Sequence, residues 1–177
     1  WSSDVCSSDL DKKADETTTT AAAVETTAAP ATTAKAAAHW TYEGEEGPEH
    51  WGELDPAYVT CADGSAQTPI DVVNAVDADL ANPVINYTAG EATVINNGHT
   101  IQLKAAEGSA LQLDGADWPL KQIHFHAPSE HTINGKSFPA EVHFVHQNDK
   151  GELAVLGVMI VEGAADNAAW KPYVDSL

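Results

Sequence analysis

Two segments in the second half of the chain alternate apolar and polar side chains with a period of two. They are residues 121–127 and 140–147. Successive side chains of a β-strand point to opposite faces of the sheet, so this alternation predicts two strands, each with one apolar face. A chain that must bury such faces needs a sheet, and we therefore predict a mainly β fold.

Further short extended segments precede these two, with turn signals between them. Residues 92–95 and 100–104 are predicted to be strands joined by a turn at Asn96-Asn97-Gly98. Residues 111–113 are followed by a second turn signal, Asp114-Gly115. Short strands with frequent turns are typical of an all-β domain.

The last part of the chain differs from these alternating segments. Residues 153–161 form a continuous apolar run, which predicts a strand buried on both faces within a large sheet that is covered on both sides. Only residues 164–174 resemble a helix, and Pro172 disturbs that pattern.

The composition divides the chain near residue 38. Residues 1–10 match nothing that follows and resemble a translated adapter sequence, so we expect them to be foreign to the protein. The rest of segment 1–38 is mostly Ala and Thr, which predicts a disordered, low-complexity tail. Residues 39–177 are predicted to form the folded part. Its first residues, 39–56, are too rich in Gly and Pro for a helix. They are expected to wrap irregularly over a core, pinned by three aromatic side chains: Trp40, Tyr42 and Trp51.

Charge excludes two classes of partner. The chain has 8 Lys and Arg against 27 Asp and Glu, a formal net charge of −19. Such a chain is not expected to bind nucleic acid through its phosphates or to associate with an anionic lipid surface. No apolar run approaches the roughly 18–20 residues that span a bilayer, and residues 1–38 show no signal-peptide pattern. A bridge between Cys6 and Cys61 is not expected, because Cys6 lies in a segment without structural pattern.

Histidine is the residue type that carries chemistry in this chain, with five of its eight copies between residues 124 and 146. If residues 122–126 form a strand, His124 and His126 share one face. Antiparallel pairing with the strand around His143 then brings these three side chains to one patch. Three neutral imidazoles without a thiolate predict a zinc site that keeps one open position, where the metal can activate a water molecule.

Two polar residues are placed to orient these ligands. Gln122 and Glu141 each precede a predicted ligand by two residues and therefore share its strand face. A ligating imidazole normally donates its other N–H to a carbonyl or carboxylate oxygen. We predict that Gln122 orients His124 and that Glu141 orients His143. His146 is out of phase with His143, which favours a structural role away from the site.

A different metal site is also compatible with part of the pattern. The spacing His124-x-His126-xxx-Glu130 approximates the first metal motif of cupin barrels, in which Glu130 would be a direct ligand and the substrate a small organic acid or sugar. The second cupin motif fits poorly, because Pro139 is followed by Ala140-Glu141 where that motif has Pro-x-Gly.

Eight short motifs follow one another along residues 39–177. They are His39-Trp40-x-Tyr42, Gly47-Pro48-x-His50-Trp51, Gln67-Thr68-Pro69-Ile70-Asp71, Asn96-Asn97-Gly98-His99, Gln122-Ile123-His124-Phe125-His126, Ser129-Glu130-His131-Thr132, Glu141-Val142-His143-Phe144-Val145-His146 and Leu153-Ala154-Val155-Leu156-Gly157. In this order they resemble the α-class carbonic anhydrases of the bacterial, secreted type. The resemblance implies a large, mostly antiparallel central sheet with a few short peripheral helices, and a periplasmic or secreted protein.

The resemblance also implies a reaction. Zinc held by His124, His126 and His143 would hydrate carbon dioxide reversibly to bicarbonate and a proton. His99 corresponds to the histidine that shuttles the proton, and Glu130 to a catalytic carboxylate beside the metal rather than to a ligand.

Further positions correspond to residues that line the site in the family. Tyr42, Asn97 and Gln102 match residues that order a chain of water molecules. Val145 and Val155 match the apolar wall that receives carbon dioxide.

The family pattern continues beyond residue 177. Its later part carries a threonine that bonds to the equivalent of Glu130, further strands, and a cysteine that pairs with the equivalent of Cys61. We therefore interpret residues 39–177 as the N-terminal portion of such a domain and expect little catalysis from this chain alone. A homodimer is an expectation for the full-length protein. A catalytically silent binding module of the same fold is the remaining alternative.

Overall fold

The structure, a computed structural model, describes residues 38–175. Within this range the chain divides into two units, one ending at Pro69 and one beginning at Ile70. Each unit is described by itself. Residues 1–37 of the predicted tail, including Cys6, lie outside the described residues.

The first unit consists of single-turn helices around an aromatic cluster. Trp40, Tyr42 and Trp51 pack edge to face, with ring centroids 5.2 to 5.8 Å apart. The indole N–H of Trp51 donates to the carbonyl oxygens of Thr41 and Glu46, at 3.0 and 3.1 Å. These contacts confirm that aromatic side chains hold this segment together.

The prediction that residues 39–56 contain no helix is wrong. Each of these helices has only three or four residues, too few for a hydrophobic period to be visible in the sequence. Within residues 39–56 they are the 3-10 helix η1 (Gly44–Glu46) and the α-helix α2 (Trp51–Leu54). The 3-10 helix η2 (Pro56–Tyr58) begins at the last residue of this segment, and the α-helix α3 (Thr60–Asp63) follows it.

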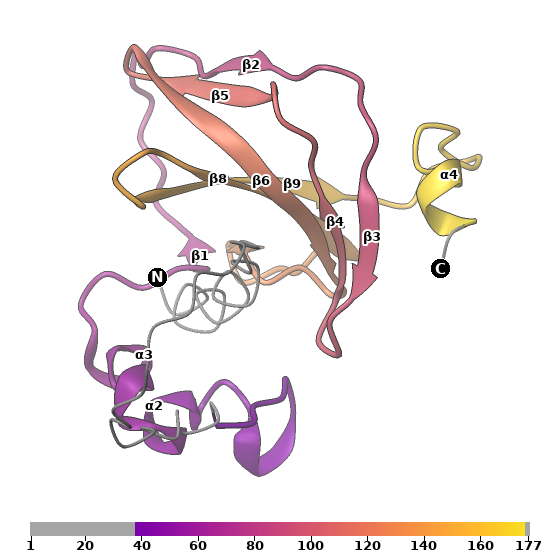
Figure 1. The fold of residues 1–177 in the computed structure, drawn as a ribbon. Coiled ribbons are helices and arrows are strands. Elements are labelled where there is room, and N and C mark those ends of the chain that lie inside the picture. Colours follow the sequence, from indigo (N-terminus) through magenta and orange to yellow (C-terminus); the bar gives the residue numbers. More distant parts are fainter. Residues whose placement is uncertain (1–37, 176–177) are drawn as a thin grey trace, which may run out of the picture. The chain divides into compact units, whose positions relative to one another are not determined.

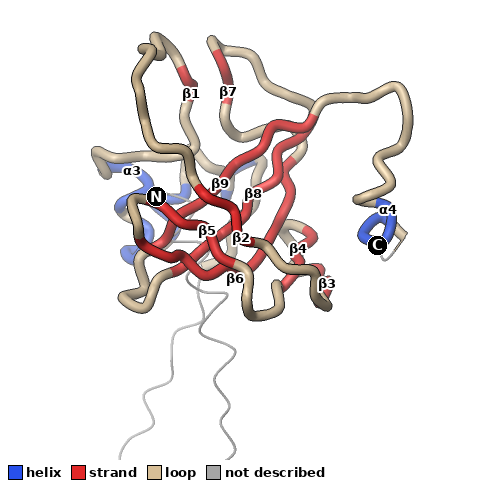
Figure 2. Tube along the Cα trace, turned by 90° about the horizontal axis from the view of Figure 1, so that it is seen from above, coloured by secondary structure: helices blue, strands red, loops and turns tan. Residues whose placement is uncertain are grey.

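The second unit is built on one antiparallel sheet, which confirms the mainly β prediction (Figure 1). The strand order is β2-β5-β6-β4-β3, and β8 pairs with both β6 and β9. The strands are β2 Val84–Asn86, β3 Thr93–Asn96, β4 Ile101–Lys104, β5 Ala110–Leu113, β6 Ala116–His126, β8 Ala140–Gln147 and β9 Leu153–Ile160. Two short strands, β1 (Asp71–Val72) and β7 (Thr132–Ile133), pair in parallel apart from this sheet (Figure 2).

The long strand β6 organises the sheet. Its first part pairs with β5 through the predicted turn, where Asp114 and Gly115 both have positive φ angles of 49° and 79°. Two positive φ angles are typical of a type I′ hairpin, whose twist matches that of the strands. Its second part pairs with β4 and β8. The strand begins five residues before the predicted segment and includes Pro119, which lies opposite Ala110.

The prediction that residues 153–161 are buried on both faces is wrong. No residue of β9 is buried, and Val155 and Val158 are 46% and 44% exposed. Within residues 38–175, β9 pairs only with β8. An apolar run shows that both faces of a strand are apolar, but whether they are covered depends on other segments. The expected cover on both sides is therefore not present over β9 in the described residues, whereas the neighbouring β8 has buried residues on both of its faces.

The predicted helix over residues 164–174 is much shorter in the structure. Helix α4 comprises only Lys171–Val174. The side chain of Asn167 accepts a hydrogen bond from the Ala169 amide in the preceding turn, and proline is tolerated in the first turn of the helix that follows. Trp170 and Tyr173 pack on Phe125, with centroids 5.2 and 4.7 Å away. None of the helices in the described part of the chain is long and apolar enough to cross a bilayer.

Candidate metal centre

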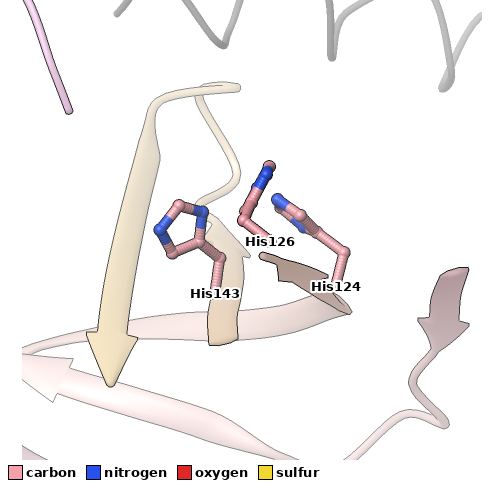
Figure 3. A group of neighbouring side chains, drawn as sticks. All are labelled: His124, His126 and His143. Atoms are coloured by element: carbon pink, nitrogen blue, oxygen red, sulfur yellow. The ribbon is translucent and has the colours of Figure 1, made fainter. Parts of the chain in front are cut away.

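Strands β6 and β8 bring three histidines together. The antiparallel register places His124 opposite His143 and His126 opposite Glu141. Because directly opposed residues share a face, all four side chains project from one side of the sheet. Figure 3 shows the three imidazole rings turned toward a common space. One nitrogen from each of the three rings lies within 4.8 Å of the others.

Hydrogen bonds fix the orientation of two of these rings. The Nδ1 atom of His124 lies 2.8 Å from Oε1 of Gln122, and Nε2 of His143 lies 2.8 Å from Oε1 of Glu141. Both oxygens can only accept, so we assign the ring hydrogens to these two nitrogens. Nε2 of His124 and Nδ1 of His143 are then the lone-pair atoms. The structure places Gln122 and Glu141 against the partners that the sequence predicts.

The Glu141 carboxylate is the centre of a larger network. It is fully buried, and each oxygen accepts two hydrogen bonds. Oε1 accepts from Nδ1 of His131 at 2.7 Å as well as from His143, and Oε2 accepts from the amides of Glu130 and His131 at 3.0 and 2.9 Å. Burial alone would raise the pKa of Glu141, but the hydrogen bonds from His131 and His143 outweigh it and lower this pKa.

His131 is a residue that the spacing argument missed. It lies outside the alternating segments, and only the tertiary fold brings it to Glu141. Its occurrence in Ser129-Glu130-His131-Thr132, one of the family-like motifs, is the only signal for it in the sequence.

The three histidines of the centre are in the neutral state at neutral pH, because their pKa values are lowered. Burial, together with the neighbouring rings of His126 and His143, lowers the pKa of His124 to about 3. Burial and His143 lower the pKa of His126 to about 4. The pKa of His143 is also lowered by burial. Neutral imidazole is the form that binds metal, so no proton has to leave these rings at neutral pH.

Glu130 lies at the edge of the same centre. Its Oε2 is 3.2 Å from Nε2 of His126 and 3.8 Å from Nδ1 of His143. Burial and the nearby Glu141 carboxylate raise the pKa of Glu130 to about 7. Both roles predicted for Glu130, a catalytic carboxylate or a metal ligand, require it close to these nitrogens.

The register places three more predicted residues on this face. Gln102 of β4 lies opposite His124, Val145 lies opposite Gln122, and Val155 of β9 lies opposite Val145. Val145 is buried, and Val155 is exposed.

The two predicted residues of the β3–β4 turn belong to one local structure. The Asn97 side chain accepts hydrogen bonds from the backbone amides of His99 and Thr100, at 2.9 and 2.8 Å. His99 is thus held in the turn, two residues before β4 begins. Tyr42 belongs to the first unit, and its predicted role stays a prediction.

His146 lies on the opposite face of β8. It is completely buried between the Tyr87 hydroxyl and the Ala154 carbonyl. This position agrees with the structural role predicted from its phase relative to His143.

Comparison with known proteins supports the resemblance. The model of the eukaryotic-type carbonic anhydrase family matches residues 46–177. A carbonic anhydrase of Klebsiella pneumoniae is 45% identical over 139 residues, which are 76% of this chain and 56% of the relative. A hyperthermostable carbonic anhydrase from a hydrothermal vent chimney superimposes with a TM-score of 0.69 at 51% identity, covering 71% of this chain and 56% of that one. The α-carbonic anhydrase of Photobacterium profundum gives a TM-score of 0.73 at 44% identity, covering 78% and 63%.

These comparisons leave the cupin-like fold without support. The chain spans 56 to 58% of the length of the first curated relatives that it matches. The family model covers three quarters of the chain, including every residue of the histidine cluster. The chain therefore belongs to the eukaryotic-type carbonic anhydrase family.

Proposed function

We propose that this protein catalyses the zinc-dependent, reversible hydration of carbon dioxide to bicarbonate and a proton. The observation that carries the proposal is the convergence of three neutral imidazoles from two paired strands, in a chain of the carbonic anhydrase family. Two of the three are already oriented by hydrogen bonds to Gln122 and Glu141.

The donor set fits zinc. One nitrogen from each of His124, His126 and His143 lies within 4.8 Å of the others, and three such nitrogens could hold one zinc ion. Held by three neutral imidazoles, a zinc ion would supply an acidified water molecule, with a pKa of about 7 in the general case of carbonic anhydrase.

The chain's own residues then have distinct tasks. His124, His126 and His143 hold the metal, and Gln122 and Glu141 keep two of these rings in the binding orientation. Because carbon dioxide is apolar, it is bound beside the metal by apolar side chains rather than by polar contacts. The side chains that we assign to this wall are Val145 and Val155.

The remaining task is the removal of a proton. His99 accepts it, since an imidazole can both take up and release a proton at neutral pH. Asn97 holds the turn that carries His99. Tyr42 and Gln102 are proposed to order the water molecules along the path, and Glu130 to act as a catalytic carboxylate.

The proposal extends to the chain as a whole. Since the chain spans little more than half of its relatives, we expect it to hydrate carbon dioxide poorly by itself. The residues missing relative to the family would include the threonine that partners Glu130. We propose a periplasmic or secreted location and a homodimer for the full-length protein, both by analogy with the family.

A chimaera tests the reaction independently of length. The matched segment of the Klebsiella pneumoniae relative is replaced by the corresponding residues of this chain, and carbon dioxide hydration is measured by stopped flow. We expect the zinc-loaded chimaera to be active and its His143→Ala variant to lose that activity. A folded, zinc-loaded chimaera without activity would contradict the proposal and favour the silent binding module.

The 177-residue chain is measured in parallel. We expect it to bind one zinc ion with little hydration activity, and its His143→Ala variant to lose the ion. Unchanged zinc binding in that variant would overturn the ligand assignment.

A further inference from the structure

The strand position beside His143 carries no side chain. On β9, Gly157 lies directly opposite His143, so one row across the sheet runs from Gln102 through His124 and His143 to Gly157. Its φ angle is not positive, so the backbone conformation does not require glycine. Glycine inside a strand costs roughly 0.5–1 kcal/mol relative to alanine, so its presence needs another reason.

The reason lies in the position of the Glu141 carboxylate. A Cβ atom built on Gly157 would lie 2.7 Å from Oε1 of Glu141 and 3.6 Å from Cδ2 of His143. Real Cβ atoms essentially never approach another heavy atom more closely than 3.0 Å. The residue directly opposite Glu141 is Met159, so the carboxylate leans diagonally along β9 and occupies the space above Gly157.

The carboxylate has no easy way to move aside. It is fully buried, and its four hydrogen bonds come from two side chains and two backbone amides. Oε1, the atom that a Cβ would strike, is the same atom that accepts from His143 and His131. Displacing Oε1 by a few tenths of an ångström therefore changes the hydrogen bond that sets the orientation of His143.

We propose that Gly157 is a positioning residue of the metal centre. Its missing side chain provides the space for the Glu141 carboxylate, and through that carboxylate it fixes the ring orientation and the hydrogen-bonded Nε2–H of His143. The part of this proposal that concerns zinc rests on the proposed function. The link from Gly157 through Glu141 to His143 involves only residues of this protein, so it can be tested without the metal.

The central test is Gly157→Ala, measured in two ways. Zinc affinity is determined by competition with a chelator, and the Nε2–H proton of His143 is followed by NMR in the metal-free protein. We expect an affinity loss of about 10–100-fold, as is typical when the partner of a metal ligand is disturbed, and a shift or loss of the proton signal. Unchanged affinity together with an unchanged signal would overturn the proposal.

Two further variants make the test specific. Gly163→Ala is the matched control, because the nearest atom to its added Cβ would be 3.5 Å away and its φ angle is not positive. We expect it to bind zinc like the unsubstituted chain. In a Glu141→Ala background, Gly157→Ala should produce no further loss of affinity, because the group that it displaces is gone. An additional loss there would show that Gly157 acts by another route and would contradict the proposal.

If the Gly157→Ala variant does not fold, a second substitution tests the proposal. Glu141→Asp shortens the side chain and withdraws the carboxylate from β9, so it should restore folding to a Gly157→Ala variant that does not fold. Absence of rescue would overturn the proposal. If the unsubstituted chain binds no zinc while Gly157→Ala still changes the His143 signal, the proposed function fails and the positioning role stands.

Discussion

Two buried histidines on β8, three residues apart, have opposite surroundings. His146 is completely buried, and the protein engages both of its ring nitrogens. Its Nδ1 lies 3.0 Å from the Ala154 carbonyl oxygen, to which it donates, and its Nε2 lies 2.7 Å from the Tyr87 hydroxyl, from which it accepts. This ring is a neutral structural residue with no atom left for a metal.

His143 is nearly as deeply buried, with 5% of its surface exposed. Only its Nε2 has a hydrogen bond, to Glu141, and its Nδ1 lies 3.8 Å from Glu130 in the space shared with His124 and His126. Burial lowers the pKa of both His143 and His146, so neither burial nor charge state separates them. The two histidines differ in what the second ring nitrogen faces: the other histidines of the metal centre for His143, and the Tyr87 hydroxyl for His146.

The largest expected difference between the two is in metal affinity. His143→Gln removes a proposed ligand and should weaken zinc binding by more than about 100-fold, the upper end of the loss seen for partners of ligands. His146→Gln should leave zinc affinity within a few-fold, although it destabilises the fold. Isothermal titration at a temperature where both variants are folded measures the difference. Equal losses of zinc affinity would contradict the different roles assigned to His143 and His146.

The next largest effect is expected from a change to the Glu130 carboxylate. Glu130→Gln should keep zinc bound but reduce carbon dioxide hydration by the chimaera about 10–100-fold, because it changes a group beside the metal and not a ligand. Metal content and hydration are measured on the same sample. Loss of zinc from Glu130→Gln would instead make Glu130 a ligand, as the cupin-like alternative predicts.

The stability of the metal-free protein should depend on pH through these same groups. His124 and His126 have pKa values of about 3 and 4 in the folded protein, below the ordinary 6.5. Their contribution to the free energy of unfolding is therefore complete above pH 6.5 and is lost as the pH falls. Glu130, with a raised pKa of about 7, acts in the opposite direction. Unfolding therefore binds a net 2 − 1 = 1 proton in this range. The free energy of unfolding should fall by about 1.4 kcal/mol for each pH unit as the pH is lowered from 6.5 to 4.5.

Denaturant titrations with EDTA at several pH values measure this slope. His143 and His146, whose pKa values are also lowered, make it steeper. A metal-free protein that gains stability as the pH falls from 6.5 to 4.5 would contradict the neutral state assigned to the cluster.

The phase of the strands explains why much of the site could be predicted from the sequence. Side chains alternate between the two faces of a strand, so the face that each residue of β6 and β8 occupies follows from its position in the sequence. The shared face of His124, His126 and His143 follows from that alternation, as do the contacts of Gln122 and Glu141 and the separation of His146. The antiparallel pairing on which that argument depends is observed, whereas the exact register comes from the structure.

The remainder depends on tertiary neighbours that no local pattern reports. His131 reaches Glu141 from a loop, and Gly157 matters only because a carboxylate from β8 leans over it. The exposure of β9 depends on what covers it, which the apolar run of residues 153–161 cannot show. The helices of the first unit have only about one turn each, too short for a hydrophobic period to be visible in the sequence.

The smallest expected effect comes from changing Tyr87, whose hydroxyl group is the hydrogen-bond partner of His146. Tyr87→Phe removes the hydroxyl that donates to Nε2 of His146 and leaves a buried acceptor without a donor, at an expected cost of about 1–2 kcal/mol in unfolding free energy. Zinc affinity should not change, because Tyr87 contacts the face of β8 opposite the metal centre. Tyr173→Phe is the control, since its hydroxyl makes a longer contact of 3.4 Å to the Ile101 carbonyl and should cost less. A change in zinc affinity on Tyr87→Phe would show that the two faces of β8 are coupled, and the separation of its two histidines would then no longer hold.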